Sequence, residues 1–234
     1  MFDISQPITV DGERNEERYQ ALLDAVLSSF AQSPEGKACA TAGCRSGDWA
    51  SMFLHYLFDY ISESLNEVTV RDVREVIFDL FPRKVSAEPD SAQEIVLELR
   101  AFWEFLGREH RLPHATAIVA FFSDETIVRL KGLLADPRNF DMAKSFVMQG
   151  RAAGFDMTTQ EGCTQFMAHY NGSILGRQSR GSADNTGDRA PPHDIGSRPL
   201  TDPSSLVHPL SHDDRNAKRR KRKAERQARK RNRR

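Results

Sequence analysis

Cysteine is scarce in this sequence, with three residues at positions 39, 44 and 163 among 234. An odd and sparse set of cysteines does not build a disulfide framework, and it favours a reducing compartment. Cys39 and Cys44 have a spacing that some zinc sites use, but a closed site needs two further ligands. His55 falls within an apolar helical pattern, and Cys163 has no recognisable base beside it. We therefore interpret Cys39 and Cys44 as small, buried thiols, and we do not expect Cys163 to be a nucleophile.

Long apolar runs and export signals are also missing. No stretch approaches the roughly 18 uninterrupted apolar residues that a membrane-spanning helix requires. The first residues, MFDISQPITVDGERNEER, contain neither the basic region nor the apolar region of a secretory signal. We expect no membrane span and a cytoplasmic location.

Familiar catalytic motifs are absent as well: the sequence has no GxGxxG, GxxxxGK(S/T), GxSxG or HExxH. His110 and His114 would pair as metal ligands only on one continuous helix, which Pro113 disfavours. Glu94 and Glu98 fall on an expected polar helix face, which favours solvated surface over an acid–base pair. We predict no catalytic residue, no metal ligand and no cofactor, and hence a protein that is not an enzyme.

Apolar residues recur at three- and four-residue intervals through most of the sequence up to position 171, which is the period of an α-helix. No alternating pattern predicts a sheet. We predict an all-α fold, a compact array of about seven or eight helices. The expected helices cover 13–33, 48–66, 69–81, 91–109, 113–122, 123–134, 136–150 and 158–170.

Local signals mark the ends of these helices. Thr69 and Ser91 are each followed three residues later by an acid, which is typical of a capping box. Asp136-Pro137 is typical of an N-cap followed by proline at the first helical position. Pro34 and Gly36 predict an end to the first helix, with a loop of small residues at 39–44.

Two further signals predict helix ends later in the chain. Pro82 is expected to stop the third helix. Asn171-Gly172 is expected to stop the last one.

Aromatic residues end at Tyr170, although the sequence runs to position 234. The 42 residues of 173–214 contain 16 Gly, Pro or Ser, so they cannot bury enough surface to offset chain entropy. We predict a helical domain over 13–171, a disordered linker over 172–214 and a basic tail over 215–234.

The formal net charge of zero hides two parts of opposite charge. The basic tail has 13 Lys and Arg and one Glu, a net charge of +12, and residues 1–214 have 20 basic and 32 acidic residues, a net charge of −12. Such asymmetry indicates a polyanionic partner, and nucleic acid releases condensed counterions when cations neutralise its phosphates. We predict electrostatic, low-specificity contacts with RNA or DNA. They are assigned to Lys218, Arg219, Arg220, Lys221, Arg222, Lys223, Arg226, Arg229, Lys230, Arg231, Arg233 and Arg234.

Other interpretations of the tail stay open at this point. It is also typical of a segment that binds anionic lipids, of a nuclear-import signal, or of a solubilising or self-inhibitory segment that folds back on the acidic body. In the last case the helical domain would be a protein-interaction or regulatory module. A protein partner or a homodimer through the helical domain is compatible with both views.

Three stretches resemble a family of bacterial all-helical proteins of no known activity: Asp72-Val-Arg-Glu-Val-Ile-Phe-Asp-Leu-Phe-Pro-Arg-Lys-Val-Ser86, Ala143-Lys-Ser-Phe, and Ala153-Gly-Phe-Asp-Met-Thr-Thr-Gln-Glu161. Members of that family are similar in ending with a Lys/Arg-rich tail. The resemblance implies a helical domain within 13–171 and a bacterial cytoplasmic setting. It implies no catalytic residue.

Overall fold

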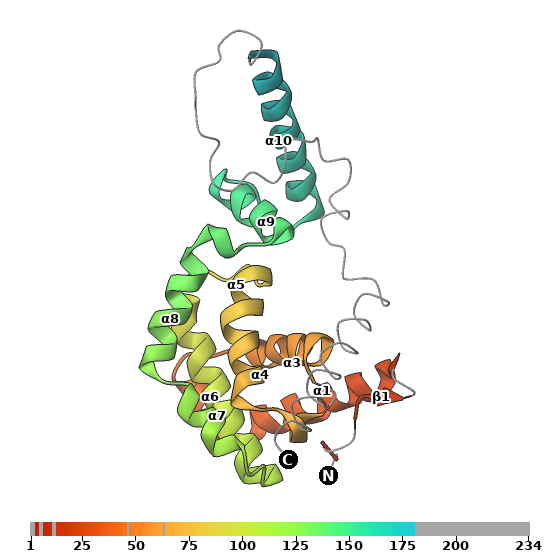
Figure 1. Ribbon diagram of the computed structural model, residues 1–234, viewed down its shortest axis with the longest axis vertical. Coiled ribbons are helices and arrows are strands. Elements are labelled where there is room, and N and C mark those ends of the chain that lie inside the picture. The colour runs from red at the N-terminus through yellow and green to blue at the C-terminus, as the bar shows by residue number, and fades with distance from the viewer. Residues whose placement is uncertain (1–2, 5–6, 11–12, 46, 63, 181–234) are drawn as a thin grey trace, which may run out of the picture. The chain divides into compact units, whose positions relative to one another are not determined.

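The computed structural model describes residues 3–4, 7–10, 13–45, 47–62 and 64–180. The basic tail and the predicted linker from residue 181 onward lie outside these residues. Within them the chain is almost entirely helical, which confirms the predicted all-α fold (Figure 1). A short antiparallel hairpin precedes the first helix, with Thr9 paired to Arg14 and Val10 paired to Glu13.

The elements follow in this order: β1 (Thr9–Val10), β2 (Glu13–Arg14), α1 (Glu16–Gln32), α2 (Pro34–Thr41), α3 (Asp48–Tyr60), η1 (Leu65–Glu67), α4 (Val70–Glu75), η2 (Val76–Leu80), α5 (Phe81–Lys84), α6 (Ser91–His110), α7 (Ala115–Phe121), α8 (Asp124–Ala135), η3 (Pro137–Asn139), α9 (Met142–Ala152) and α10 (Gln160–Arg180). Of the short helices, η1 and η3 are 3-10 helices and η2 is a π-helix. No helix among the described residues combines the length and the apolar character that crossing a membrane requires.

The described residues divide into two compact units. The first unit comprises the described residues of 3–80 and 88–133, and the second comprises 81–87 and 134–180. Sequence patterns predict one helical domain over 13–171. They could not distinguish two units, because helical periodicity does not indicate which helices share a core.

Aromatic side chains form the core of the first unit around α6, which packs against α2, α3 and α7. Phe30 of α1 meets Phe102 of α6 edge to face, with 5.3 Å between ring centroids. Phe53 of α3 meets Trp103 of α6 in the same way, at 6.3 Å. All four side chains are fully buried. Each buried phenylalanine stabilises the fold by about 1.5–3 kcal/mol through its removal from water.

The loop predicted at 39–44 is wrong in its first half, because α2 extends to Thr41. Ser33 caps this helix, its Oγ accepting the backbone N–H of Gly36 at 3.0 Å, and Pro34 is its first residue. Proline and glycine were interpreted as helix terminators, yet a proline directly after a serine N-cap is preorganised for a helix start. Ser33 is therefore both the C-cap of α1 and the N-cap of α2, and Pro34 is the first residue of α2.

Gly36 is required where α2 turns away from α1. A β-carbon at this position would overlap the carbonyl oxygen of Phe30. We expect Gly36→Ala to destabilise the protein by about 1–3 kcal/mol, since the backbone must move to relieve the overlap. The matched control is Gly132→Ala in α8, where a β-carbon meets no atom within 4 Å. That change should stabilise by up to about 1 kcal/mol. Urea unfolding of both variants checks the opposite signs, and equal effects would contradict the prediction.

Two predicted helix starts differ from the structure. The N-cap of α6 is Asp90, so Ser91 is already helical, and the Glu94 carboxylate accepts the Arg45 backbone N–H at 3.3 Å instead of closing a capping box. Asp136 caps only the 3-10 turn η3. The longer helix α9 begins after Asp141, whose Oδ1 accepts the backbone N–H of the third helical residue.

Three predicted helix ends are wrong. The helix predicted over 48–66 ends at Tyr60 in α3, and the separate 3-10 helix η1 follows at Leu65–Glu67. Helical structure runs without a break from Val70 through Pro82 to Lys84, and the π-helix η2 directly precedes α5, the segment that contains this proline. Helix α10 continues through Asn171-Gly172 to Arg180, into the segment predicted as a linker. Glycine costs a helix only about 1 kcal/mol, so it does not by itself enforce a stop.

The second unit has its own small core between α9 and α10. Phe146, Met157, Phe166 and Tyr170 are buried there. Lys144 is buried too, and its Nζ donates to the Pro82 carbonyl at 2.9 Å. A buried ammonium is stable only with such partners. The bond fastens α9 to α5 within this unit.

Candidate functional site

All of the residues predicted to bind nucleic acid, from Lys218 to Arg234, lie outside the described residues. The structure therefore bears on the other candidates that the sequence singled out. These are the cysteine pair, the histidines and the acidic residues of α6. It also shows one surface cluster that sequence patterns did not indicate.

Cys39 and Cys44 lie together at the end of α2. The backbone N–H of Cys44 donates to the Cys39 carbonyl at 3.0 Å, and that of Gly43 donates to the Ala40 carbonyl at 3.1 Å. Gly43 has a φ of 91°, as the left-handed residue of this helix ending requires. The arrangement is a Schellman motif, in which the residues in the positions of Cys39 and Cys44 contact each other. Both thiols are buried, which confirms their interpretation as small buried side chains.

Glu98 corrects the interpretation of the α6 acids as solvated surface. Its side chain is fully buried, and its Oε1 accepts the backbone N–H of Ala50 at 2.8 Å. Gly47 precedes α3 without a capping side chain, so the Glu98 carboxylate takes that role from another helix. Burial outweighs these hydrogen bonds and raises the pKa of Glu98 to about 7. The helix period places Glu98 beside polar residues, and its partner at Ala50 is visible only in three dimensions.

The buried acid also affects the cysteine pair. Burial, the neighbouring Cys44 thiol and the charges of Glu98 and Glu94 all raise the pKa of Cys39 far above its ordinary range. A thiol with a raised pKa is a poor nucleophile. Within the described part of the chain no group of three or more His, Cys, Asp or Glu has the arrangement of a metal site. The contacts of these residues are those of helix ends: Cys39 and Cys44 close α2, and Glu98 caps α3.

These environments predict unequal thiol reactivity. Cys163 is only half-buried, whereas Cys39 and Cys44 are buried. At pH 8 a disulfide reagent should modify Cys163 at least about tenfold faster than the other two, because its sulfur is more accessible and because burial raises the pKa of Cys39. Reagent absorbance over time measures this. Cys163→Ser should abolish the fast phase, and a fast phase that persists in this variant would contradict the assignment.

The histidines do not form a pair. His110 is the last residue of α6, and His114 precedes α7. His114 Nε2 lies 3.2 Å from the Leu65 carbonyl oxygen. His55 lies with Tyr19 and Asp59, 3.5 Å from the Tyr19 hydroxyl and 3.6 Å from the Asp59 carboxylate. His55 and His114 thus have separate polar contacts, and His110 lies against the Phe105 ring, with 6.0 Å between ring centroids.

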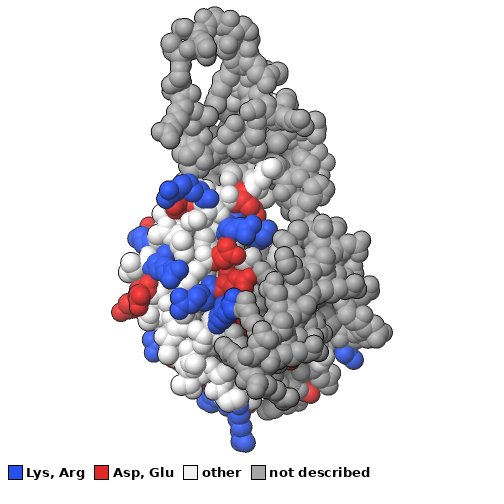
Figure 2. Space-filling view, in the orientation of Figure 1, with Lys and Arg blue, Asp and Glu red and all other residues white. Residues whose placement is uncertain are grey.

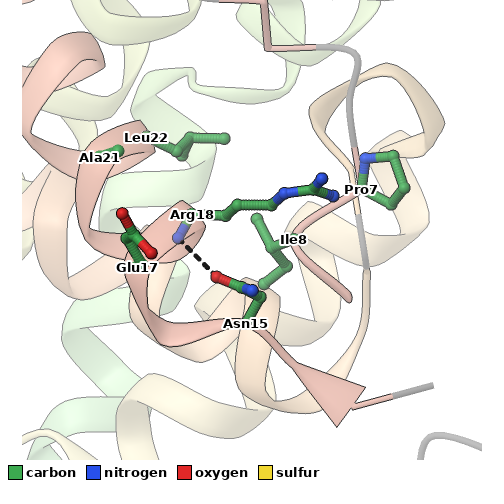
Figure 3. A pocket seen from close by; sticks show the side chains of 7 residues that line it. All are labelled: Pro7, Ile8, Asn15, Glu17, Arg18, Ala21 and Leu22. Atoms are coloured by element: carbon green, nitrogen blue, oxygen red, sulfur yellow. Dashed lines mark hydrogen bonds between the residues drawn. The ribbon is translucent and has the colours of Figure 1, made fainter. Parts of the chain in front are cut away.

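A pocket of about 310 Å³ opens beside the hairpin and the start of α1 (Figure 3). Asn15 caps α1 there by accepting the Arg18 backbone N–H at 2.9 Å, and the Arg18 side chain extends across the pocket toward Pro7. The lining mixes apolar side chains with one acid and one base. It contains Pro7, Ile8, Asn15, Glu17, Arg18, Ala21 and Leu22. No catalytic constellation follows from these residues.

Two arginines and two phenylalanines meet on the surface of the first unit, and we call Arg74, Phe78, Phe121 and Arg129 the arginine–phenylalanine cluster. The two rings are 5.4 Å apart between centroids. The Arg74 Cζ lies 5.9 Å from the Phe78 centroid and 5.4 Å from that of Phe121, and the Arg129 Cζ lies 4.3 Å from that of Phe78. Both arginines are exposed, and both rings are half-buried. The cluster joins α4, η2, α7 and α8, so no local sequence pattern reveals it.

Charges of both signs are mixed on the face of the molecule that Figure 2 shows. Lys and Arg side chains of the described residues are interleaved with Asp and Glu, and the lower part of that face is largely uncharged. The visible described surface thus has no continuous region of one sign.

No protein-family model, curated protein or solved structure matches the chain. The resemblance to a family of bacterial helical proteins therefore stays a prediction. Any function must be argued from the residues themselves.

Proposed function

We propose that the protein is a non-enzymatic, nucleic-acid-associated protein of the cytoplasm, whose basic tail makes electrostatic, poorly sequence-selective contacts with RNA or DNA. The observation that carries the proposal is the net charge of +12 over 215–234. Cations at this density repel one another, and a phosphate backbone relieves that repulsion while releasing its own counterions. Because the tail contains no aromatic residue, it offers no ring on which bases stack, and its Lys and Arg side chains act mainly through their charge. Its contacts are therefore with phosphates.

The charge of the rest of the chain supports the tail as the part that attracts nucleic acid. Residues 1–172 have 16 basic and 26 acidic residues, a net charge of −10, so their overall field repels a polyanion. Long-range attraction to nucleic acid must come from the tail.

The test compares the full chain with two variants in the binding of a labelled 20-nucleotide single strand, measured by fluorescence anisotropy. One variant ends at Asp214, and the other keeps the full length but replaces the 13 Lys and Arg of 215–234 with Gln. Both should bind at least about 100-fold more weakly in 50 mM salt, since phosphate contacts dominate affinity. A third variant with the tail residues in shuffled order should bind like the natural chain. Undiminished binding by the Gln variant would refute the proposal.

A further inference from the structure

The arginine–phenylalanine cluster has a second feature besides its internal contacts. Among the described residues neither Arg74 nor Arg129 forms an ion pair, whereas three other exposed arginines do. Arg100 pairs with Glu104, Arg108 with Glu35 and Arg138 with Asp136, at distances of 2.7–3.1 Å. The guanidinium groups of the cluster thus keep donors directed to solvent.

A purely structural role accounts for part of the cluster. A cation over an aromatic ring contributes about 0.5–1 kcal/mol at an exposed site. That contact limits the positions of the two guanidinium groups. Both arginines are still exposed, so their N–H groups can meet a ligand, and prior ordering by the rings reduces the entropy lost on binding.

We propose that the arginine–phenylalanine cluster is a second nucleic-acid contact, which binds unpaired bases and phosphates of a single strand. The proposal rests on the tail-based function above and deepens it. An arginine plane stacks on a base, and its N–H groups donate to phosphate oxygens, sometimes two at once. Both guanidinium groups lie over the Phe78 ring, with the Arg74 Cζ 5.9 Å and the Arg129 Cζ 4.3 Å from its centroid, so one ring holds both cations near each other at the surface.

The two contacts differ in what they recognise. The tail provides charge and guanidinium groups that no aromatic ring holds in place, so its contacts are mainly with phosphates. The cluster requires a base face, which a duplex keeps inside its stack. The cluster should therefore add more affinity for a single strand than for a duplex of equal length, and loss of the cluster should weaken single-strand binding more than duplex binding.

The test uses the full chain, a labelled 20-nucleotide oligouridine and a 20-base-pair RNA duplex, with anisotropy read in 150 mM salt. Arg74→Gln/Arg129→Gln should weaken binding of the single strand by roughly tenfold or more and binding of the duplex by less than about twofold. Arg74→Lys/Arg129→Lys keeps the charge but loses the planar group, and it should show most of the same loss. The matched control is Arg100→Gln, which removes an exposed but ion-paired arginine and should change neither affinity. Thermal unfolding checks that each variant is folded.

The outcomes separate the two proposals. If the natural chain binds both probes and the double variants bind them equally well, the cluster proposal is overturned and the tail-based function stands. If the double variants lose affinity for the single strand and the duplex equally, the cluster acts only through its charge, and the cluster proposal is overturned as well. Equal loss on an acidic peptide of the same net charge would assign the cluster to protein partners instead. If the natural chain binds neither probe, both proposals fail.

Discussion

Raising the salt concentration from 50 to 200 mM should weaken binding of the full chain to duplex DNA by roughly 10³-fold, if about half of the tail cations contact phosphates. The logarithm of the affinity falls by about 0.9 per phosphate neutralised for each tenfold rise in salt. A plot of log affinity against log salt therefore counts the contacts. Changing the DNA sequence at fixed length should leave the slope unchanged. A slope near zero, or affinity that depends on sequence more than on salt, would contradict an electrostatic tail.

The acidic part of the chain lowers this slope, because it competes with nucleic acid for the tail. Residues 1–214 have a net charge of −12, equal and opposite to the tail. Salt weakens attraction between tail and body as well as attraction between tail and DNA. The measured count of phosphates should thus be smaller than the 13 basic residues of the tail. The full-length variant with Gln in place of the 13 tail Lys and Arg gives the salt dependence without a charged tail, and we expect its affinity to change little with salt.

The success of the helix predictions has a local cause. Thr69 illustrates it, because its Oγ accepts the Asp72 backbone N–H and the Asp72 carboxylate accepts the Thr69 backbone N–H, as the capping-box pattern predicts. Both partners lie within one turn, so four residues of sequence contain the whole motif. The apolar stripes are local in the same sense. The all-α fold was therefore accessible from sequence.

The errors arise where a side chain contacts a residue that is distant in the sequence. Glu94 fits a capping box in sequence, but Arg45 offers its carboxylate another donor. Glu98 fits a polar face, but α3 begins without a capping side chain of its own. The buried Glu98 carboxylate therefore accepts the Ala50 N–H in the first turn of α3. Arg74 and Arg129 are 55 positions apart, and only the packing of α8 beside η2 brings both to Phe78. Such contacts depend on tertiary structure, which no short pattern encodes.

Glu98→Gln should change how stability depends on pH. The pKa of Glu98 is raised from 4.5 to about 7 in the folded state, so between these values the folded protein binds a proton that the unfolded chain releases. Stability from this group is therefore present below pH 4.5 and is lost as pH rises to about 7. At 1.36 kcal/mol per pH unit, that gap corresponds to about 3 kcal/mol. The variant should match the natural protein near pH 5 and exceed its stability by up to about 3 kcal/mol at pH 8.

Urea unfolding at pH 5 and pH 8 measures the difference, with Glu104→Gln as the control because Glu104 is exposed and forms an ion pair at the surface. The control should show a difference of less than about 1 kcal/mol between the two pH values. Glu98→Met then separates charge from capping, since methionine has a similar length but leaves the Ala50 N–H without an acceptor. It should be about 1–3 kcal/mol less stable than Glu98→Gln at both pH values. If the glutamine and methionine variants are equally stable, the carboxylate does not cap α3. If Glu98→Gln shows no gain at pH 8, the buried charge is not the source of the pH dependence.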